Sequence, residues 1–149
     1  MTTQEIVKLN DEVLSAWNKH DTQRFLSLCT DKVIWKDTGA PQEYTGKEGA
    51  RKFFEMWLKG FPDLKLALKN TIVGENSIAG EIEFSGTHTG SLKMEGGPEV
   101  AATNKKVTAN RGSYFAWFKD GKVSAVHTYP DLAGMMAQLG LLQEAHTAL

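Results

Sequence analysis

The stretch VIWKDTGAPQEYTGKEGARKFF, residues 33–54, is expected to join a buried strand to an amphipathic helix through a short loop. The strand, residues 33–35, is apolar and leads directly to the carboxylate of Asp37. Thr45 and Glu48 have the spacing of a capping box, in which two side chains bind backbone N–H groups at the start of a helix. The stretch therefore predicts an acid at the end of a buried strand, opposite a helix with an aromatic face. Such a joint suits a small pocket enzyme, and it is equally common as plain structure.

Helices are also expected on both sides of this stretch, where apolar residues recur at three- and four-residue steps. An amphipathic helix over residues 4–19 precedes a shorter one that begins at Asp21, a residue type favoured as an N-cap. The helix of the opening stretch should end before Pro62, which cannot continue it. A last helix is expected after Asp131, with Gly140 as its C-terminal stop.

Strands are expected between the third helix and the last one. Alternating apolar and polar residues mark the first two, and the third is apolar on both faces towards its end, as in a central strand. An Asp-Gly turn joins the third strand to the fourth in a hairpin. Residues 90–106 are rich in glycine and polar residues, so we expect a long, mobile connection there that could cover a pocket mouth. The expected strands cover residues 64–69, 81–88, 107–118 and 123–129.

This order of elements predicts a single α+β domain over residues 1–149. Helices gathered on one face of a curved antiparallel sheet form a cone, and the helices do not fill its interior completely. A chain of 149 residues can bury a sufficient core without disulfides or a metal.

Composition and charge exclude several classes of function. The net charge of −1 and the lack of any Lys/Arg run give no basis for nucleic-acid binding. No apolar run reaches the roughly 18 residues of a membrane span, and no leader pattern is present, so we expect no membrane partner and a cytoplasmic location. Cys29 is the only cysteine and is expected to be a buried structural thiol. The four histidines lack metal-ligand spacing, so no metal site is expected.

Six local motifs carry a resemblance to a known family. They are NKHD (residues 18–21), YTGKE (44–48), FSGTHTG (84–90), PEVAATNKKV (98–107), RGSYFAWFKDGKV (111–123) and DLAGMMAQLG (131–140). With the order of helices and strands, these motifs resemble the nuclear transport factor two-like superfamily and, within it, the polyketide-cyclase (SnoaL-like) family. The resemblance covers nearly the whole chain and implies the cone-shaped α+β fold.

The resemblance also implies cofactor-independent chemistry on a hydrophobic, carbonyl-bearing small molecule. A carboxylate removes a proton next to the carbonyl, and ring closure or double-bond migration follows. Burial in an apolar cone raises the pKa of a carboxylate, which makes it a stronger base towards a carbon acid. The enolate oxygen then needs a hydrogen-bond donor.

Two carboxylates are candidates for the base. Asp37 stands where the related steroid isomerases keep theirs, although an ordinary loop aspartate makes turn hydrogen bonds at such a place. Asp131 corresponds to an acid that opens the last helix in cyclase-like relatives, although aspartate is a favoured N-cap whatever the function. The isomerases' oxyanion tyrosine would align with Val13, and Tyr114 falls near the position of their second donor.

Three further polar residues are candidates for the site. His88 shares a strand face with Ile82 and Phe84, which makes it either a pocket residue or a satisfied core histidine. Arg111 lies within an apolar strand and needs a carboxylate partner, from the protein or from a ligand. His127 has a similar place in the last strand. The expected catalytic residues are Asp37, His88, Asp131 and Arg111.

Aromatic residues are expected either to line the pocket or to fill the core, and at least half of them should do the latter. Together with His127, the expected substrate-binding residues are Trp17, Trp35, Phe54, Trp57 and Tyr114.

Three functions remain open at this point. The favoured one is a cyclase or isomerase, and convergence of Asp37, His88 and Asp131 on one cavity would support it. Dispersal of these residues would favour a protein that binds a small molecule without turnover. Hydrolysis of an epoxide or ester ranks last, because Thr128 stands where the limonene-epoxide-hydrolase relatives have a carboxylate. A homodimer that pairs through the outer faces of the sheet is expected in each case.

Overall fold

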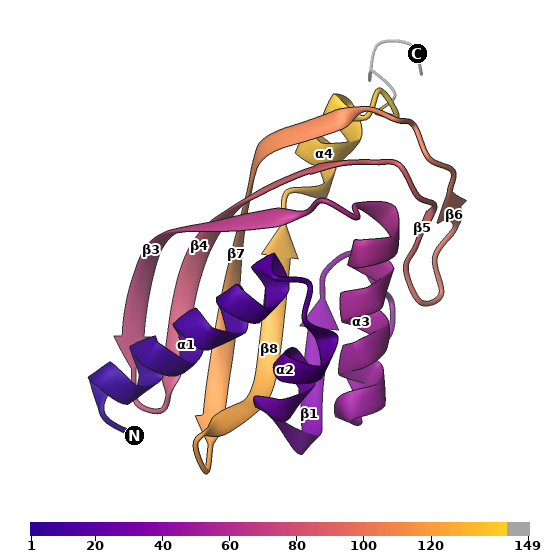
Figure 1. Ribbon diagram of the computed structural model, residues 1–149. Coiled ribbons are helices and arrows are strands. Elements are labelled where there is room, and N and C mark those ends of the chain that lie inside the picture. Colours follow the sequence, from indigo (N-terminus) through magenta and orange to yellow (C-terminus); the bar gives the residue numbers. More distant parts are fainter. Residues whose placement is uncertain (143–149) are drawn as a thin grey trace.

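The computed structural model describes residues 1–142, in which helices pack on one face of a curved sheet (Figure 1). The helices begin and end within a few residues of the positions that their periodicity predicts. They are α1 (Thr3–Asn18), α2 (Thr22–Ser27), α3 (Gly46–Gly60) and α4 (Leu132–Gln138).

The main sheet has the strand order β2-β1-β8-β7-β4-β3. Its strands are β1 (Cys29–Asp37), β2 (Tyr44–Thr45), β3 (Lys65–Gly74), β4 (Ser77–Thr87), β7 (Lys106–Lys119) and β8 (Lys122–Pro130). The short strands β5 (Leu92–Lys93) and β6 (Glu99–Val100) pair with each other outside the main sheet.

One pair of neighbours corrects the expectation of an antiparallel sheet. β1 and β8 run parallel, whereas the other neighbours in the main sheet are antiparallel. The difference arises because α3 returns the chain before the meander of β3, β4 and β7 begins, which leaves β8 running in the direction of β1. The α+β class and the curved, cone-forming sheet are confirmed.

Helix caps confirm two expectations and overturn a third. The carboxylates of Asp21 and Asp131 accept hydrogen bonds from backbone N–H groups in the first turns of α2 and α4. Thr45 makes no such side-chain bond to α3, and Glu48 contacts Arg51 at 3.3 Å instead of reaching back. The expected capping box is therefore wrong. Thr45 is paired with Ile34 in the sheet, so strand pairing fixes where α3 begins.

The connection over residues 90–106 is more structured than its composition predicts. It contains the hairpin of β5 and β6, and its Leu92 side chain is buried. A Cβ on Gly60 would lie 2.9 Å from the Leu92 side chain, so only glycine lets the hairpin approach the end of α3 this closely.

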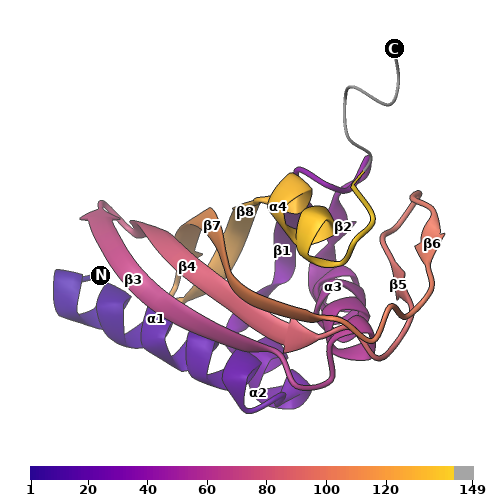
Figure 2. The same cartoon turned by 90° about the horizontal axis from the view of Figure 1, so that it is seen from above.

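Aromatic packing holds the helices on the concave face. Trp17 of α1 meets Phe54 of α3 at a centroid distance of 4.4 Å, and Phe25 of α2 stacks on the same Phe54 at 4.9 Å. Trp35 of β1 meets Phe53 at 5.1 Å. Seen from above, α1 lies along β3 and β4, and α4 lies over the far end of the sheet (Figure 2). The elements thus surround a space that this core does not fill.

Candidate active site

A cavity of about 130 Å³ lies between the helices and the concave face of the sheet. Its wall is mostly apolar, with a few polar side chains placed among tryptophan, phenylalanine and aliphatic residues. This is the usual character of a small-molecule site. The polar residues that border the cavity include Asn10, Asp37, Asn110, Arg111, Ser113, Tyr114 and Thr128, and the large apolar ones include Trp17, Trp35, Phe53, Trp57, Phe84 and Phe118.

Asp37, at the end of β1, is the one carboxylate among the described residues of this wall, and it is 6 % exposed. One carboxylate oxygen accepts a hydrogen bond from the Gly39 N–H at 2.7 Å, and the other accepts one from the Thr128 hydroxyl at 2.6 Å. Burial raises the pKa of Asp37 above its ordinary value of 3.8, and the two hydrogen bonds oppose part of that rise. Asp37 is therefore both a turn aspartate and a desolvated acid facing a cavity.

The parallel pairing of β1 with β8 explains why Asp37 and Thr128 meet. The two residues are partners in the register of these strands. Gly39 is needed for a different reason, because a Cβ there would lie 2.6 Å from the Leu132 side chain and 3.0 Å from the Asp37 carboxylate. A larger residue at this position would therefore have to displace the Leu132 side chain or the Asp37 carboxylate.

Asp131 does not line the cavity. Its side chain is exposed and accepts a hydrogen bond from the Gly134 N–H at 2.8 Å, which is the geometry of an N-cap. The rival acid of the sequence prediction thus lies apart from Asp37, outside the cavity wall.

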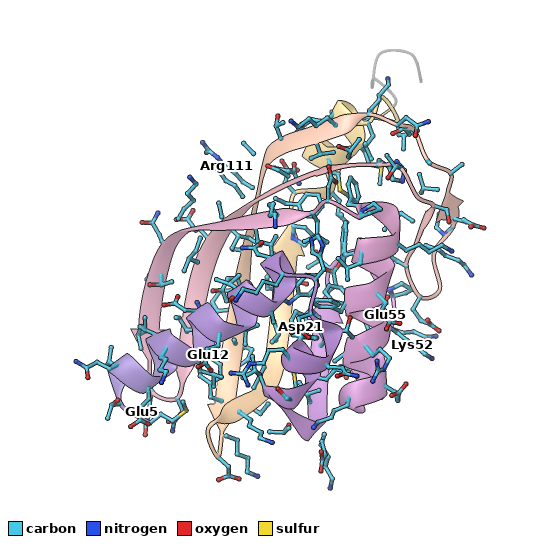
Figure 3. The ribbon with its side chains drawn as sticks, in the orientation of Figure 1. Glu5, Glu12, Asp21, Lys52, Glu55 and Arg111 are labelled. Carbon is cyan, nitrogen blue, oxygen red and sulfur yellow. The ribbon has the colours of Figure 1, made fainter. Side chains whose placement is uncertain are left out.

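Arg111 is one of the residues that border the cavity, but it is exposed and its side chain points to the outer face of the sheet, away from the helices (Figure 3). The alternation of β7 accounts for this, because Asn110, Gly112 and Tyr114 face inward and Arg111 falls between them. No carboxylate in residues 1–142 forms an ion pair with Arg111, so the protein partner that the sequence suggested is not found among the described residues.

His88 is fully buried but lies outside the cavity wall. Its ring stacks on Phe61 at 5.2 Å, and its Nδ1 accepts a hydrogen bond from the Thr103 N–H at 3.2 Å. Desolvation lowers the pKa of His88 below 6.5. The ring therefore fastens the segment before β7 to the end of β4. Ile82 and Phe84 do face the cavity, so the shared strand face does not extend to His88.

The remaining aromatic candidates divide between cavity, core and outer surface. Trp17, Trp35, Trp57 and Tyr114 line the cavity, whereas Phe54 is completely buried among other rings and does not. His127 contacts Trp117 at 4.6 Å on the outer face of the sheet and takes no part in the cavity wall.

The sequence prediction missed four polar residues that border the cavity, namely Asn10, Asn110, Ser113 and Thr128. Asn10 is 4 % exposed, and its amide oxygen accepts a hydrogen bond from the Tyr114 hydroxyl at 2.8 Å. Its sequence signal was available, because it lies four residues after Ile6 and three before Val13 on the apolar stripe of α1. Thr128 carried no comparable signal, since its role depends on the register between two strands.

Within residues 1–142, no three His, Cys, Asp or Glu side chains gather in a way that could hold a metal ion. None of the helices described is long and apolar enough to cross a membrane.

Solved structures with the same fold are numerous. AclR from Streptomyces galilaeus, proposed to be a hydroxylase, is 25% identical, with a TM-score of 0.78 over 96% of this chain and 89% of that one. A protein of Jannaschia sp. CCS1, proposed to be a SnoaL-like polyketide cyclase, is 17% identical, with a TM-score of 0.81 over 94% of both chains. TsrD from Streptomyces laurentii is 21% identical, with a TM-score of 0.80 over 95% of this chain and 99% of that one.

The sequence itself matches a family model over most of its length. No curated protein shows a significant match to the chain. The model of the SnoaL-like polyketide cyclases, however, matches residues 7–139, which extend from within α1 to the residue after α4. The chain therefore belongs to the SnoaL-like polyketide cyclase family.

Proposed function

We propose that this protein is a cofactor-independent cyclase or isomerase that removes a proton next to a carbonyl group of a hydrophobic small molecule. The observation that carries the proposal is the buried carboxyl group of Asp37 in the wall of a mostly apolar cavity. The fold alone does not select this reaction, because AclR shares it and is proposed to be a hydroxylase. The buried carboxyl group of Asp37 is what favours proton abstraction over other reactions.

Asp37 acts as the base in the proposed step. The carboxylate takes a proton from the carbon beside the carbonyl, the C–H electron pair forms a C=C bond, and the carbonyl π pair moves to oxygen. A ketone and a carboxylate thus become an enolate and a carboxylic acid. Return of the proton to another carbon of the conjugated system completes an isomerisation. In a cyclisation, the enolate carbon instead attacks a second carbonyl, and the resulting alkoxide takes up the proton.

The surroundings of Asp37 suit this step for two reasons. Desolvation raises its pKa, which increases its basicity towards carbon, and the mostly apolar wall offers few groups that would compete for the proton. The bonds from Gly39 and Thr128 hold the carboxylate in one orientation. A base held in place before the substrate arrives loses little entropy at the transition state.

Trp35 is the donor that we propose for the enolate oxygen near this base. Its indole N–H is buried and has no hydrogen-bond acceptor among the described residues, and the side chain lines the cavity. Trp35 precedes Asp37 by two residues, so both side chains leave the same face of β1, with Cα atoms about 6.6 Å apart. A preorganised donor at that distance can meet charge that develops on the oxygen of the same carbonyl group.

Binding without turnover is the second candidate, and one observation favours it. His88 and Asp131 are not part of the cavity wall, so the expected convergence of Asp37, His88 and Asp131 on one cavity is absent from the described residues. The same apolar cavity could then hold a ligand, and Asp37 would only stabilise the turn at Gly39. The two candidates differ in whether the carboxylate of Asp37 is needed for a chemical step.

The outer face of the sheet provides the basis for a separate proposal about assembly. We propose that two copies of the chain pair through this face. Phe115, Trp117 and Tyr129 form a contiguous cluster of rings on β7 and β8, and their exposures are 44 %, 38 % and 45 %. Ile72 on β3 adds a side chain that is 77 % exposed. A patch of this kind is costly on a monomer and is typical of an interface.

Hydrogen–deuterium exchange tests the base directly. 1-Tetralone, a bicyclic ketone, is incubated in D₂O with the protein, and loss of the C2 proton signal is followed by NMR. We expect the wild type to accelerate exchange and Asp37→Asn to reduce the acceleration by about a hundredfold or more. Asparagine can keep the Gly39 bond through its oxygen, and the Thr128 hydroxyl can turn to the Lys36 carbonyl, which lies 3.3 Å away.

Asp131→Asn is the matched control, because asparagine is an equally good N-cap and the substitution should not unfold α4. If Asp131→Asn lost the acceleration while Asp37→Asn kept it, the base would be Asp131. If the wild type bound 1-tetralone without accelerating exchange, the binding candidate would replace the enzyme.

A further inference from the structure

Three buried side-chain atoms have no hydrogen-bond partner among the described residues: Asn10 Nδ2, Trp35 Nε1 and His88 Nε2. Buried polar groups are nearly always paired, so each such atom requires an explanation. His88 lies outside the cavity, whereas Asn10 and Trp35 belong to its wall. Trp35 already has a proposed role beside Asp37. The amide of Asn10 remains to be explained.

The orientation of the Asn10 amide is set by Tyr114. The Tyr114 hydroxyl donates to the amide oxygen at 2.8 Å, so the NH₂ group is the end left without a partner. Turning the amide over would leave both the amide oxygen and the phenol hydrogen without partners, which makes the observed orientation the better one. Asn10 therefore presents a donor that an acceptor oxygen of a ligand can satisfy.

The position of Tyr114 places this donor far from Asp37. Asp37, Thr128 and Tyr114 are register partners across β1, β8 and β7, so the first and last are two strand spacings, about 10 Å, apart at Cα. The Tyr114 ring then leans further away, over Gly80 of β4, where an added Cβ would lie 2.5 Å from the ring. Asn10, on the helix that lies along β3 and β4, meets the phenol there (Figure 2).

We propose that the Asn10 amide, held by Tyr114, anchors a second oxygen of the ligand at the end of the cavity opposite Asp37. The inference rests on the proposed function, because the far oxygen is defined relative to the carbon that Asp37 deprotonates. It narrows the substrate class to elongated, mostly apolar molecules with one carbonyl group near the base and another acceptor oxygen at the far end. Asn10 is thus a positioning and specificity residue and takes no part in proton transfer.

Paired ligands that differ in one oxygen test the anchor. The probes are 1-tetralones with an acetyl group at C5, C6 or C7, each beside its isopropenyl analogue, in which CH₂ replaces the acetyl oxygen. Affinities are measured by calorimetry. We expect the wild type to bind at least one acetyl compound about tenfold more tightly than its analogue, since the oxygen satisfies a buried donor. Asn10→Leu, of similar volume, should abolish that preference.

Two further variants separate recognition from folding. Asn18→Leu removes a part-buried asparagine from the end of the same helix. Asn18 is not part of the cavity wall, although its amide bonds to the backbone of the wall residue Leu66, so the substitution should lower stability and keep the acetyl preference. Tyr114→Phe frees the Asn10 amide to turn and should reduce the preference by roughly threefold. With a ¹³C-labelled acetyl carbonyl, the NMR signal of the bound ligand should move downfield in wild type and not in Asn10→Leu.

The test of the Asn10 anchor does not depend on whether Asp37 acts as a base. If no acetyl compound were preferred by the wild type, or if Asn10→Leu kept the preference, the anchor would be excluded. Calorimetry reads binding alone, so an anchor that is confirmed while deuterium exchange fails would leave the ligand class intact and overturn only the chemical step.

Discussion

The two faces of the central sheet carry similar side chains and put them to different uses. On β7, Tyr114, Ala116 and Phe118 face the helices and are buried, while Phe115 and Trp117 alternate with them on the outer face and are exposed. The inner aromatic residues surround a cavity with polar atoms that lack partners, whereas the outer rings mainly contact one another. An apolar residue in this sheet therefore indicates burial only if it is known which face the helices cover.

The largest effect should come from emptying the inner core. Phe54→Ala removes a ring that is completely buried between Trp17 and Phe25, and the free energy of unfolding should fall by about 3–5 kcal/mol. Phe115→Ala deletes the same ring from the outer face and should cost well under half of that. Urea denaturation of both variants measures the difference. Equal losses would show that the outer face is as firmly packed as the inner one.

A charge on the outer face should dissociate the proposed dimer. The wild type should sediment with twice the chain mass of 16.5 kDa, and Trp117→Glu should sediment as a monomer because two like charges would meet on the symmetry axis or beside it. Lys52→Glu makes a larger change in charge, from +1 to −1, at an exposed position of α3 on the other side of the molecule, and it should leave the mass unchanged (Figure 3). A monomeric wild type at micromolar concentration would refute the pairing.

Ionisation of Asp37 on the inner face should lower the stability of the fold, and this loss should depend on pH. The pKa of Asp37 is raised in the fold, so its contribution to stability is fully present below its ordinary pKa of 3.8 and is lost as pH rises through the folded value. Asp37→Asn escapes that loss. Its Tm relative to wild type should therefore be higher at pH 7, and the gain should shrink towards pH 3. A wild type more stable than Asp37→Asn at pH 7 would contradict the raised pKa.

Local patterns in the sequence predicted most of the fold. Periodicity and cap residues such as Asp21 and Asp131 are properties of neighbouring residues, and the helices appear where they indicate. The parallel pairing of β1 with β8 could not be predicted in that way, because it joins residues about ninety positions apart. The Asp37–Thr128 contact depends on that pairing and was missed with it.

The same distinction between local and long-range information applies to the candidate site. Asp37 could be found from its place at the end of a strand, but the direction of Arg111 could not, since apolar residues on both faces of β7 conceal which face is covered. His88 was assigned to the cavity by extending the alternation of Ile82 and Phe84 past Thr87, where β4 ends. Alternation has no meaning beyond the last paired residue, so the prediction of its direction failed there.

Thr128→Val should have the smallest effect, and it tests how much the Thr128 hydrogen bond changes the pKa of Asp37. Valine keeps the shape of the side chain but removes the hydroxyl that donates to Asp37 at 2.6 Å. Losing this bond should cost about 0.5–1.5 kcal/mol of stability. The bond also lowers the pKa of Asp37, so its removal should raise that pKa further. The pH midpoint of deuterium exchange should then move upward, because a base must be ionised to act and the ionised form now requires a higher pH. A downward shift would mean that Thr128 stabilises the protonated acid, and the hydroxyl would have to accept from Asp37 while donating to the Lys36 carbonyl.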